Sequence, residues 1–105
     1  MPRHVGEGAQ PPDPGLLILA SLAGGPKHGY AIIEDVARLA SVRLGPGTLY
    51  GALARLEERG MIEALASEDR RRPYRLTGSG REMLGEQLAS MQRIAEAGLR
   101  RLDAV

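Results

Sequence analysis

PGTLYGALARLEERG, residues 46–60, predicts a helix with a defined start and a defined end. Pro46 suits the first position of a helix, because its missing N–H has no partner to lose there. Gly60 suits the position just past the last turn, where left-handed backbone is common. Large apolar residues recur at positions i, i+4 and i+7 and predict the buried face: Leu49, Leu53 and Leu56.

The opposite face of this helix carries almost no large side chains. At about 100° per residue, it consists of Gly47, Gly51, Ala54 and Glu58. Thr48 and Arg55 flank this face on one side, and Tyr50 flanks it on the other. Such a surface lets the backbone approach the wall of a DNA groove. We therefore expect Thr48, Tyr50 and Arg55 to reach base edges or nearby phosphates.

The flanking sequence predicts helices and a hairpin around this segment. The first helix opens at Asp13 or Pro14, is apolar on most sides, and ends at the Gly24-Gly25-Pro26 turn. A second helix covers roughly 28–40, and its apolar stripe is expected at Tyr30, Ile33, Ala37 and Ala40, broadened by Ile32, Val36 and Leu39. Strands are expected at 61–66 and 73–76, and Thr77 caps a last helix. This is a mainly α fold with a small β-hairpin, in the order of a winged helix-turn-helix.

The tip of the predicted hairpin is rich in arginine. We expect Arg70, Arg71 and Arg72 to lie along DNA phosphates or in the minor groove. The alternative is a solvated loop, since Glu68 and Asp69 come immediately before and partly offset the charge.

The turn before the second helix is a further candidate for a phosphate contact. Lys27 and His28 lie where the free N–H groups of the helix start could hold one DNA phosphate. The glycines there do not have the spacing of a nucleotide-binding loop, and they follow a helix rather than a strand.

The last helix carries an apolar stripe that steps by 4, 3, 4, 3 and 4 residues, as in a heptad pattern: Leu84, Leu88, Met91, Ala95, Gly98 and Leu102. Leu99, Met83 and Ile94 widen it. We expect a homodimer interface formed by Leu84, Leu88, Met91, Ala95, Leu99 and Leu102. The alternative is that this helix packs on its own domain.

Composition excludes several other classes. The chain has 105 residues and a net charge of +1, no Cys and two His, so we expect no disulfide, no metal site and no cofactor. No catalytic constellation is visible, and an enzyme is not expected. Residues 1–14, rich in Pro and Gly, predict a disordered tail. No signal peptide or membrane-spanning stretch is visible, which predicts a soluble, cytoplasmic protein. We expect the DNA-binding domain at 15–77 and the dimerisation helix at 78–105.

These segments resemble the PadR family of transcriptional regulators. The resemblance rests on Gly25-Pro26-Lys27-His28-Gly29-Tyr30, on Pro46-Gly47-Thr48-Leu49-Tyr50, and on Tyr74-Arg75-Leu76-Thr77, in this order and spacing. It covers about residues 15–85. It implies an N-terminal winged helix, a single C-terminal dimerisation helix, and repression that a small molecule lifts. It also places Gly47, Thr48 and Tyr50 on the DNA-reading helix.

The chain departs from the family pattern in two places. Gly45 stands where the family often has a capping Ser, and the last helix has no aromatic residue to stack a flat ligand. Two other functions are kept open. One is a winged-helix module that binds a protein instead of DNA. The other is a small-molecule sensor whose dimer cavity is lined by Met83, Leu84 and Met91.

Overall fold

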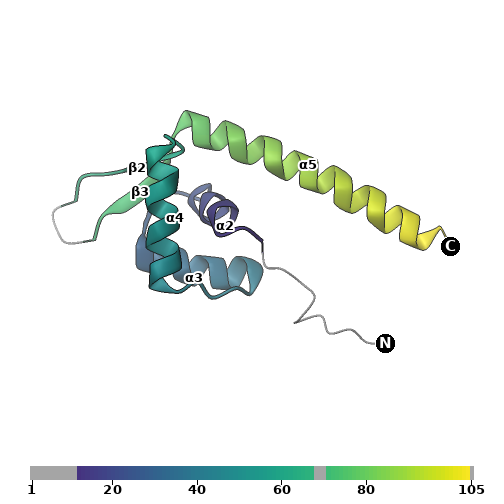
Figure 1. Cartoon of the computed structure of the whole chain (residues 1–105), viewed down its shortest axis with the longest axis horizontal. Helices are drawn as coiled ribbons and strands as arrows, with labels where there is room; N and C mark the ends of the chain where they lie inside the picture. Colours follow the sequence, from purple (N-terminus) through teal and green to yellow (C-terminus); the bar gives the residue numbers. More distant parts are fainter. Residues whose placement is uncertain (1–11, 68–70, 105) are drawn as a thin grey trace.

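The first described helix, α2 (Pro14–Leu22), forms the centre of the domain. The computed structural model describes residues 12–67 and 71–104 of the chain. The Asp13 carboxylate caps α2 by accepting a hydrogen bond from the Leu16 N–H at 3.2 Å, and Pro14 occupies the first turn, as predicted. Leu17, Ile18 and Leu22 are buried. As Figure 1 shows, α2 lies between the other helices of the domain.

The next helix, α3 (Gly29–Ala40), begins one residue after the predicted start, because His28 serves as its cap. The imidazole Nδ1 of His28 accepts a hydrogen bond from the Ala31 N–H at 3.4 Å. The buried face was predicted correctly for Ile32 and Val36, which are fully buried, and wrongly for Tyr30 and Leu39, which are 65% and 56% exposed. Because residues two apart on a helix point about 160° away from each other, burying Ile32 turns Tyr30 outward.

The helix predicted from the opening stretch is α4 (Pro46–Glu58). Leu49, Leu53 and Leu56 are buried, as expected. Gly45 caps its start without a side-chain hydrogen bond. At its end Gly60 has a φ of +77°. The Met61 N–H then bonds to the Leu56 carbonyl at 2.9 Å, and the Gly60 N–H to the Glu57 carbonyl at 3.0 Å, which is a Schellman motif.

The predicted hairpin is present, but the described residues form a sheet of three strands instead of two. The strands are β1 (Lys27–His28), β2 (Ile62–Ala64) and β3 (Pro73–Leu76), in the antiparallel order β1-β3-β2. The extra strand is β1, in which Lys27 pairs with Tyr74 and His28 with Pro73. The wing is therefore attached to the start of α3.

The last helix, α5 (Gly78–Asp103), begins on the body of the domain and then leaves it (Figure 1). Thr77 caps it, as predicted, by accepting a hydrogen bond from the Gly80 N–H at 3.0 Å. Leu84 is its last buried side chain. Within 12–67 and 71–104, no helix is both long enough and apolar enough to cross a bilayer.

Candidate nucleic-acid interface

The predicted reading face of α4 is turned to solvent. Gly47, Thr48, Ala54 and Arg55 are exposed, Tyr50 is 52% exposed, and Gly51 is partly covered. A Cβ added to Gly47 would meet nothing within 4 Å in the described part of the chain. At Gly51 the Cβ would meet only the Arg55 guanidinium, at an ordinary 3.6 Å. The domain's own packing does not require glycine at either position, which fits a surface approached by an outside partner.

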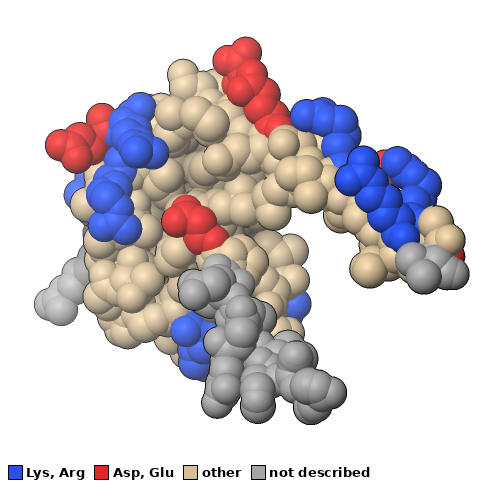
Figure 2. Space-filling view, turned by 45° about the vertical axis from the view of Figure 1, so that its right-hand side comes forward, with Lys and Arg blue, Asp and Glu red and all other residues tan. Residues whose placement is uncertain are grey.

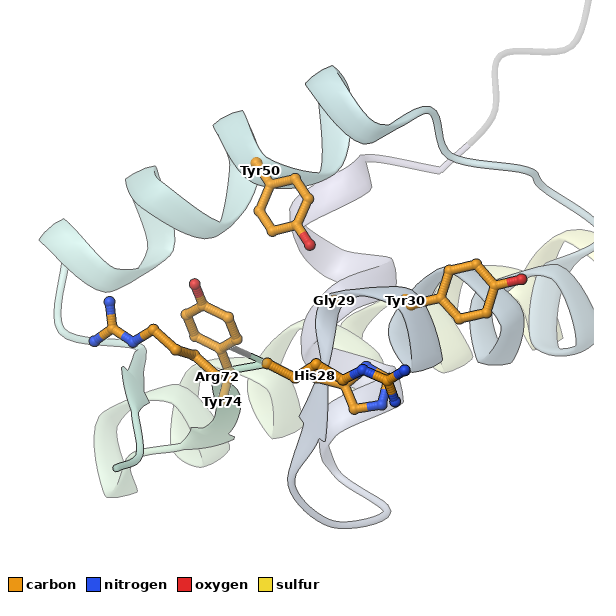
Figure 3. A pocket seen from close by; sticks show the side chains of 7 residues that line it. His28, Gly29, Tyr30, Tyr50, Arg72 and Tyr74 are labelled. Carbon is orange, nitrogen blue, oxygen red and sulfur yellow. The ribbon is translucent and has the colours of Figure 1, made fainter. Parts of the chain in front are cut away.

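Beside α4 lies a hollow of about 260 Å³ that the sequence did not predict. The chain has only three aromatic residues, and all three line it: Tyr30, Tyr50 and Tyr74. The rest of the described lining is His28, Gly29, Arg71 and Arg72, so it includes no carboxylate. Figure 3 shows that Tyr50 comes from α4, Tyr30 from the start of α3, and Tyr74 from the sheet that faces α4.

Gly29 allows α4 and α3 to meet at this hollow. A Cβ on Gly29 would lie 2.5 Å from the Tyr50 hydroxyl oxygen and 3.1 Å from a Leu49 methyl carbon. Any larger residue would therefore push Tyr50 away from the start of α3. The Nδ1 of His28 accepts the Ala31 N–H, which leaves Nε2 for a partner from outside.

The Lys27 side chain makes hydrogen bonds and an ion pair within the protein. Its Nζ donates hydrogen bonds to the carbonyl oxygens of Ser21 at 2.6 Å and Gly25 at 3.3 Å, and lies 3.9 Å from Asp35. The Ser21 hydroxyl donates to Asp35 at 2.7 Å. That hydrogen bond, together with the charges of Lys27 and Arg38, outweighs burial and lowers the pKa of the Asp35 carboxyl. The phosphate contact of Lys27 stays a prediction, and these internal partners compete with it.

The wing carries its described arginines in two settings. Arg71 and Arg72 are exposed and line the hollow, while the predicted Arg70 lies outside the described residues. Arg75 is tied across the hairpin to Glu63, with Nε to Oε2 at 2.7 Å. Glu63 and Arg75 are direct partners in the β2–β3 register, and because both side chains are about half exposed, their ion pair adds little stability.

The residues predicted for a dimer interface divide into two groups. Leu84 is 4% exposed and belongs to the core of its own domain. The other five are exposed along α5: Leu88, Met91, Ala95, Leu99 and Leu102. Met83 lines a small hollow of about 140 Å³ with residues of α2 and α4, and Met91 is not part of it. The predicted sensor cavity belongs to a dimer, so it stays a prediction.

The sequence also matches a known family. A model of the transcriptional regulator PadR-like family matches residues 18–86. The chain belongs to this family. The match spans the winged domain and the first turns of α5, and the family is one of transcriptional regulators.

Within the described residues, no group of three or more His, Cys, Asp or Glu could hold a metal ion.

Two proteins are similar in sequence to this PadR-like chain. It is 37% identical over 86 residues to the transcriptional regulator Rv3488 of Mycobacterium tuberculosis, covering 76% of this chain and 77% of that protein. It is 47% identical over 83 residues to an uncharacterised 37.1 kDa protein in transposon TN4556 of Streptomyces fradiae. That match covers 79% of this chain but only 24% of the Streptomyces protein.

The fold is also that of a solved family member. A PadR family transcription regulator from Clostridium difficile R20291 superposes with a TM-score of 0.75 at 28% identity, over 85% of this chain and 97% of that one. The winged-helix architecture is therefore common to both proteins.

Proposed function

We propose that this PadR-like protein is a homodimeric repressor that binds a two-fold DNA operator in the cytoplasm, with α4 in the major groove and the wing beside it. The observation that carries the proposal is the outward face of α4. Its glycines at 47 and 51 are not needed by the domain's own packing, and the side chains around them face solvent. Glycine at these two positions would let the α4 backbone approach the wall of a DNA groove closely.

Each exposed residue then has a role. Thr48, Tyr50 and Arg55 lie where they would contact base edges or adjacent phosphates, and an arginine can pair with guanine through two hydrogen bonds. Arg71 and Arg72 would neutralise phosphates beside the site. His28 would add a donor at the start of α3.

The proposal of a homodimer is supported by the apolar side chains of α5. Five large ones beyond Leu84 are at least 43% exposed: Leu88, Met91, Ile94, Leu99 and Leu102. Four of them, all but Ile94, fall within about 60° of Leu84 on the helix, while Glu82, Glu86, Arg93 and Arg100 fall opposite. Figure 2 shows basic side chains gathered toward the free end of α5. A helix with one apolar and one charged face, projecting from its domain, needs a covering surface, and a second α5 supplies one of the same pattern.

A matched pair of glycine variants tests the DNA contact. Gly47→Glu and Gly78→Glu each place a carboxylate in open space in the first turn of a helix, where a negative charge is tolerated. Duplexes are first selected from genomic fragments at near-physiological salt, and affinity is then measured by fluorescence anisotropy. We expect Gly47→Glu to lose binding and Gly78→Glu to keep it. Equal affinity of both variants for the selected duplex would show that α4 does not contact the DNA. Failure to select any duplex would favour a protein partner.

The release of the operator by a small molecule is a separate part of the proposal. A ligand that binds the folded dimer raises its unfolding temperature. Compounds that do so are expected to weaken the anisotropy signal of the same duplex. A compound that stabilises the protein and leaves its DNA affinity unchanged would argue against this regulation.

A further inference from the structure

The tyrosine-lined hollow has a composition suited to an anion. Its described lining offers three phenols, one imidazole and two guanidinium groups, with no carboxylate. Among these described residues, a cation would find no counter-charge. A phosphate group, by contrast, accepts hydrogen bonds from phenol, imidazole and guanidinium groups.

The hydroxyls of Tyr50 and Tyr74 are the donors best placed for such a group. In Figure 3 both rings project into the space between α4 and the sheet, and the Tyr74 hydroxyl is directed toward α4. The Tyr30 hydroxyl points away from both. Within the described residues, neither the Tyr50 nor the Tyr74 hydroxyl has a hydrogen-bond partner in the protein. Both are therefore available to a ligand.

The hollow also lies between the two segments that the proposed function brings to DNA. Tyr50 belongs to α4, whose neighbouring residues face the groove, and Tyr74 belongs to β3, which begins directly after Arg72. A phosphate held here would be flanked by the recognition helix on one side and the wing on the other. Its position would fix how α4 sits against the bases.

We propose that Tyr50 and Tyr74 jointly donate hydrogen bonds to one phosphodiester of the DNA backbone, seated in this hollow. The inference rests on the proposed function and adds to it a phosphate contact made by neutral donors from two elements. A phenol hydroxyl carries no charge at neutral pH, so this contact releases no counterion. It adds affinity without steepening the dependence of binding on salt, whereas the wing arginines steepen it.

Tyrosine-to-phenylalanine variants test the contact on the full chain. Each change deletes one hydroxyl oxygen and leaves the ring. We expect Tyr50→Phe and Tyr74→Phe each to weaken binding of the selected duplex by about tenfold, the usual size for a hydrogen bond to a charged group, with the slope of log affinity against log salt unchanged. Tyr30→Phe is the matched control and should bind like the parent. Equal unfolding temperatures of all variants exclude a folding defect.

The DNA supplies the second half of the test. A series of duplexes, each with one phosphate replaced by a neutral methylphosphonate, is bound to the parent and to the Tyr50→Phe/Tyr74→Phe double variant. We expect one phosphate position in each half-site at which the substitution weakens the parent but not the double variant. Phenylalanine variants that bind like the parent would overturn the inference and leave DNA binding by α4 intact.

Tyrosine fluorescence separates the DNA phosphate from a free one. The chain has no Trp, and its three Tyr all line the hollow, so the emission of the whole protein reports on this site. We expect the selected duplex to change the emission and inorganic phosphate at millimolar concentration to leave it unchanged. Saturable quenching by inorganic phosphate, with unchanged DNA affinity of the double variant, would assign the hollow to a free anion and overturn the proposed DNA contact. A parent that binds no duplex would overturn the proposed function itself.

Discussion

Gly80 in the first turn of α5 leaves no space for any side chain. A Cβ added there would overlap the carbonyl oxygen of Met61 and lie 2.9 Å from its carbonyl carbon. These atoms belong to the backbone that links α4 to β2, so they cannot swing aside as a flexible side chain would. Gly80→Ala must therefore push the start of α5 away from the end of α4.

The cost follows from the hydrogen bonds at this junction. The Thr77 N–H bonds to the Met61 carbonyl at 3.0 Å, the Thr77 hydroxyl donates to the Gly60 carbonyl at 2.6 Å, and the same oxygen caps Gly80 at 3.0 Å. Losing a cap costs about 1 kcal/mol, and each further hydrogen bond costs roughly 0.5–1.5 kcal/mol. Subtracting about 1 kcal/mol for the better helix propensity of Ala, we expect a loss of roughly 1–3 kcal/mol in unfolding free energy.

Urea unfolding followed by circular dichroism measures this loss, at one fixed protein concentration because a dimer's stability depends on it. Gly78→Ala is the matched control, since its added Cβ meets nothing within 4 Å in the described structure. It should unfold at the same or a slightly higher urea concentration than the parent. If Gly80→Ala unfolds together with the parent, the close contact between α5 and Met61 does not exist in solution.

Four further outcomes are expected. Leu88→Asp places a charge on the exposed stripe of α5 and should reduce the mass measured by sedimentation from that of a dimer to that of a monomer. An unchanged mass would show that the dimer interface does not include Leu88. Arg55→Ala should weaken operator binding by about 1–3 kcal/mol if it pairs with guanine, and a titration identical to the parent's would reject that role. Replacing Arg71 and Arg72 by Ala removes four guanidinium groups from a dimer and should make the slope of log affinity against log salt shallower by about 4; a slope equal to the parent's would show that these arginines do not contact phosphates. A hydrogen bond from the Ser21 hydroxyl and the charges of Lys27 and Arg38 lower the pKa of Asp35. The ionised carboxylate therefore stabilises the fold fully at a pH above its unfolded-state pKa of about 3.9, and this stabilisation is lost as the pH falls through the lower folded-state pKa. The stability difference between the parent and Asp35→Asn should therefore be constant above about pH 5 and narrow below about pH 4; a difference independent of pH would contradict the pairing.

The sequence predicted best where a local rule determines the structure. Pro46 and Gly60 set the ends of α4, Thr77 capped α5, and the leucine spacing identified the buried face of α4. Each of these signals acts within a few residues, so no knowledge of tertiary contacts was needed. The same holds for Asp13 at the start of α2.

Predictions failed where the outcome depends on distant segments. Tyr30 was expected in the core because it is large and lies on a helical period, but burial of Ile32 and Val36 in the core decides the orientation of α3. The strand β1 has only two residues, and it exists because β3 pairs with it. The hollow was missed for the same reason, since Tyr30, Tyr50 and Tyr74 come together only through α3, α4 and that added strand.

The central claim is that two copies joined through α5 present their α4 helices to one operator. Native mass spectrometry of the protein with a selected duplex tests it most directly, because it counts protein chains per DNA. We expect two chains on each duplex carrying a two-fold site and, for Leu88→Asp, a loss of that species. A single chain per duplex at saturation, or a parent that stays monomeric and binds no duplex even at low salt, would contradict the claim.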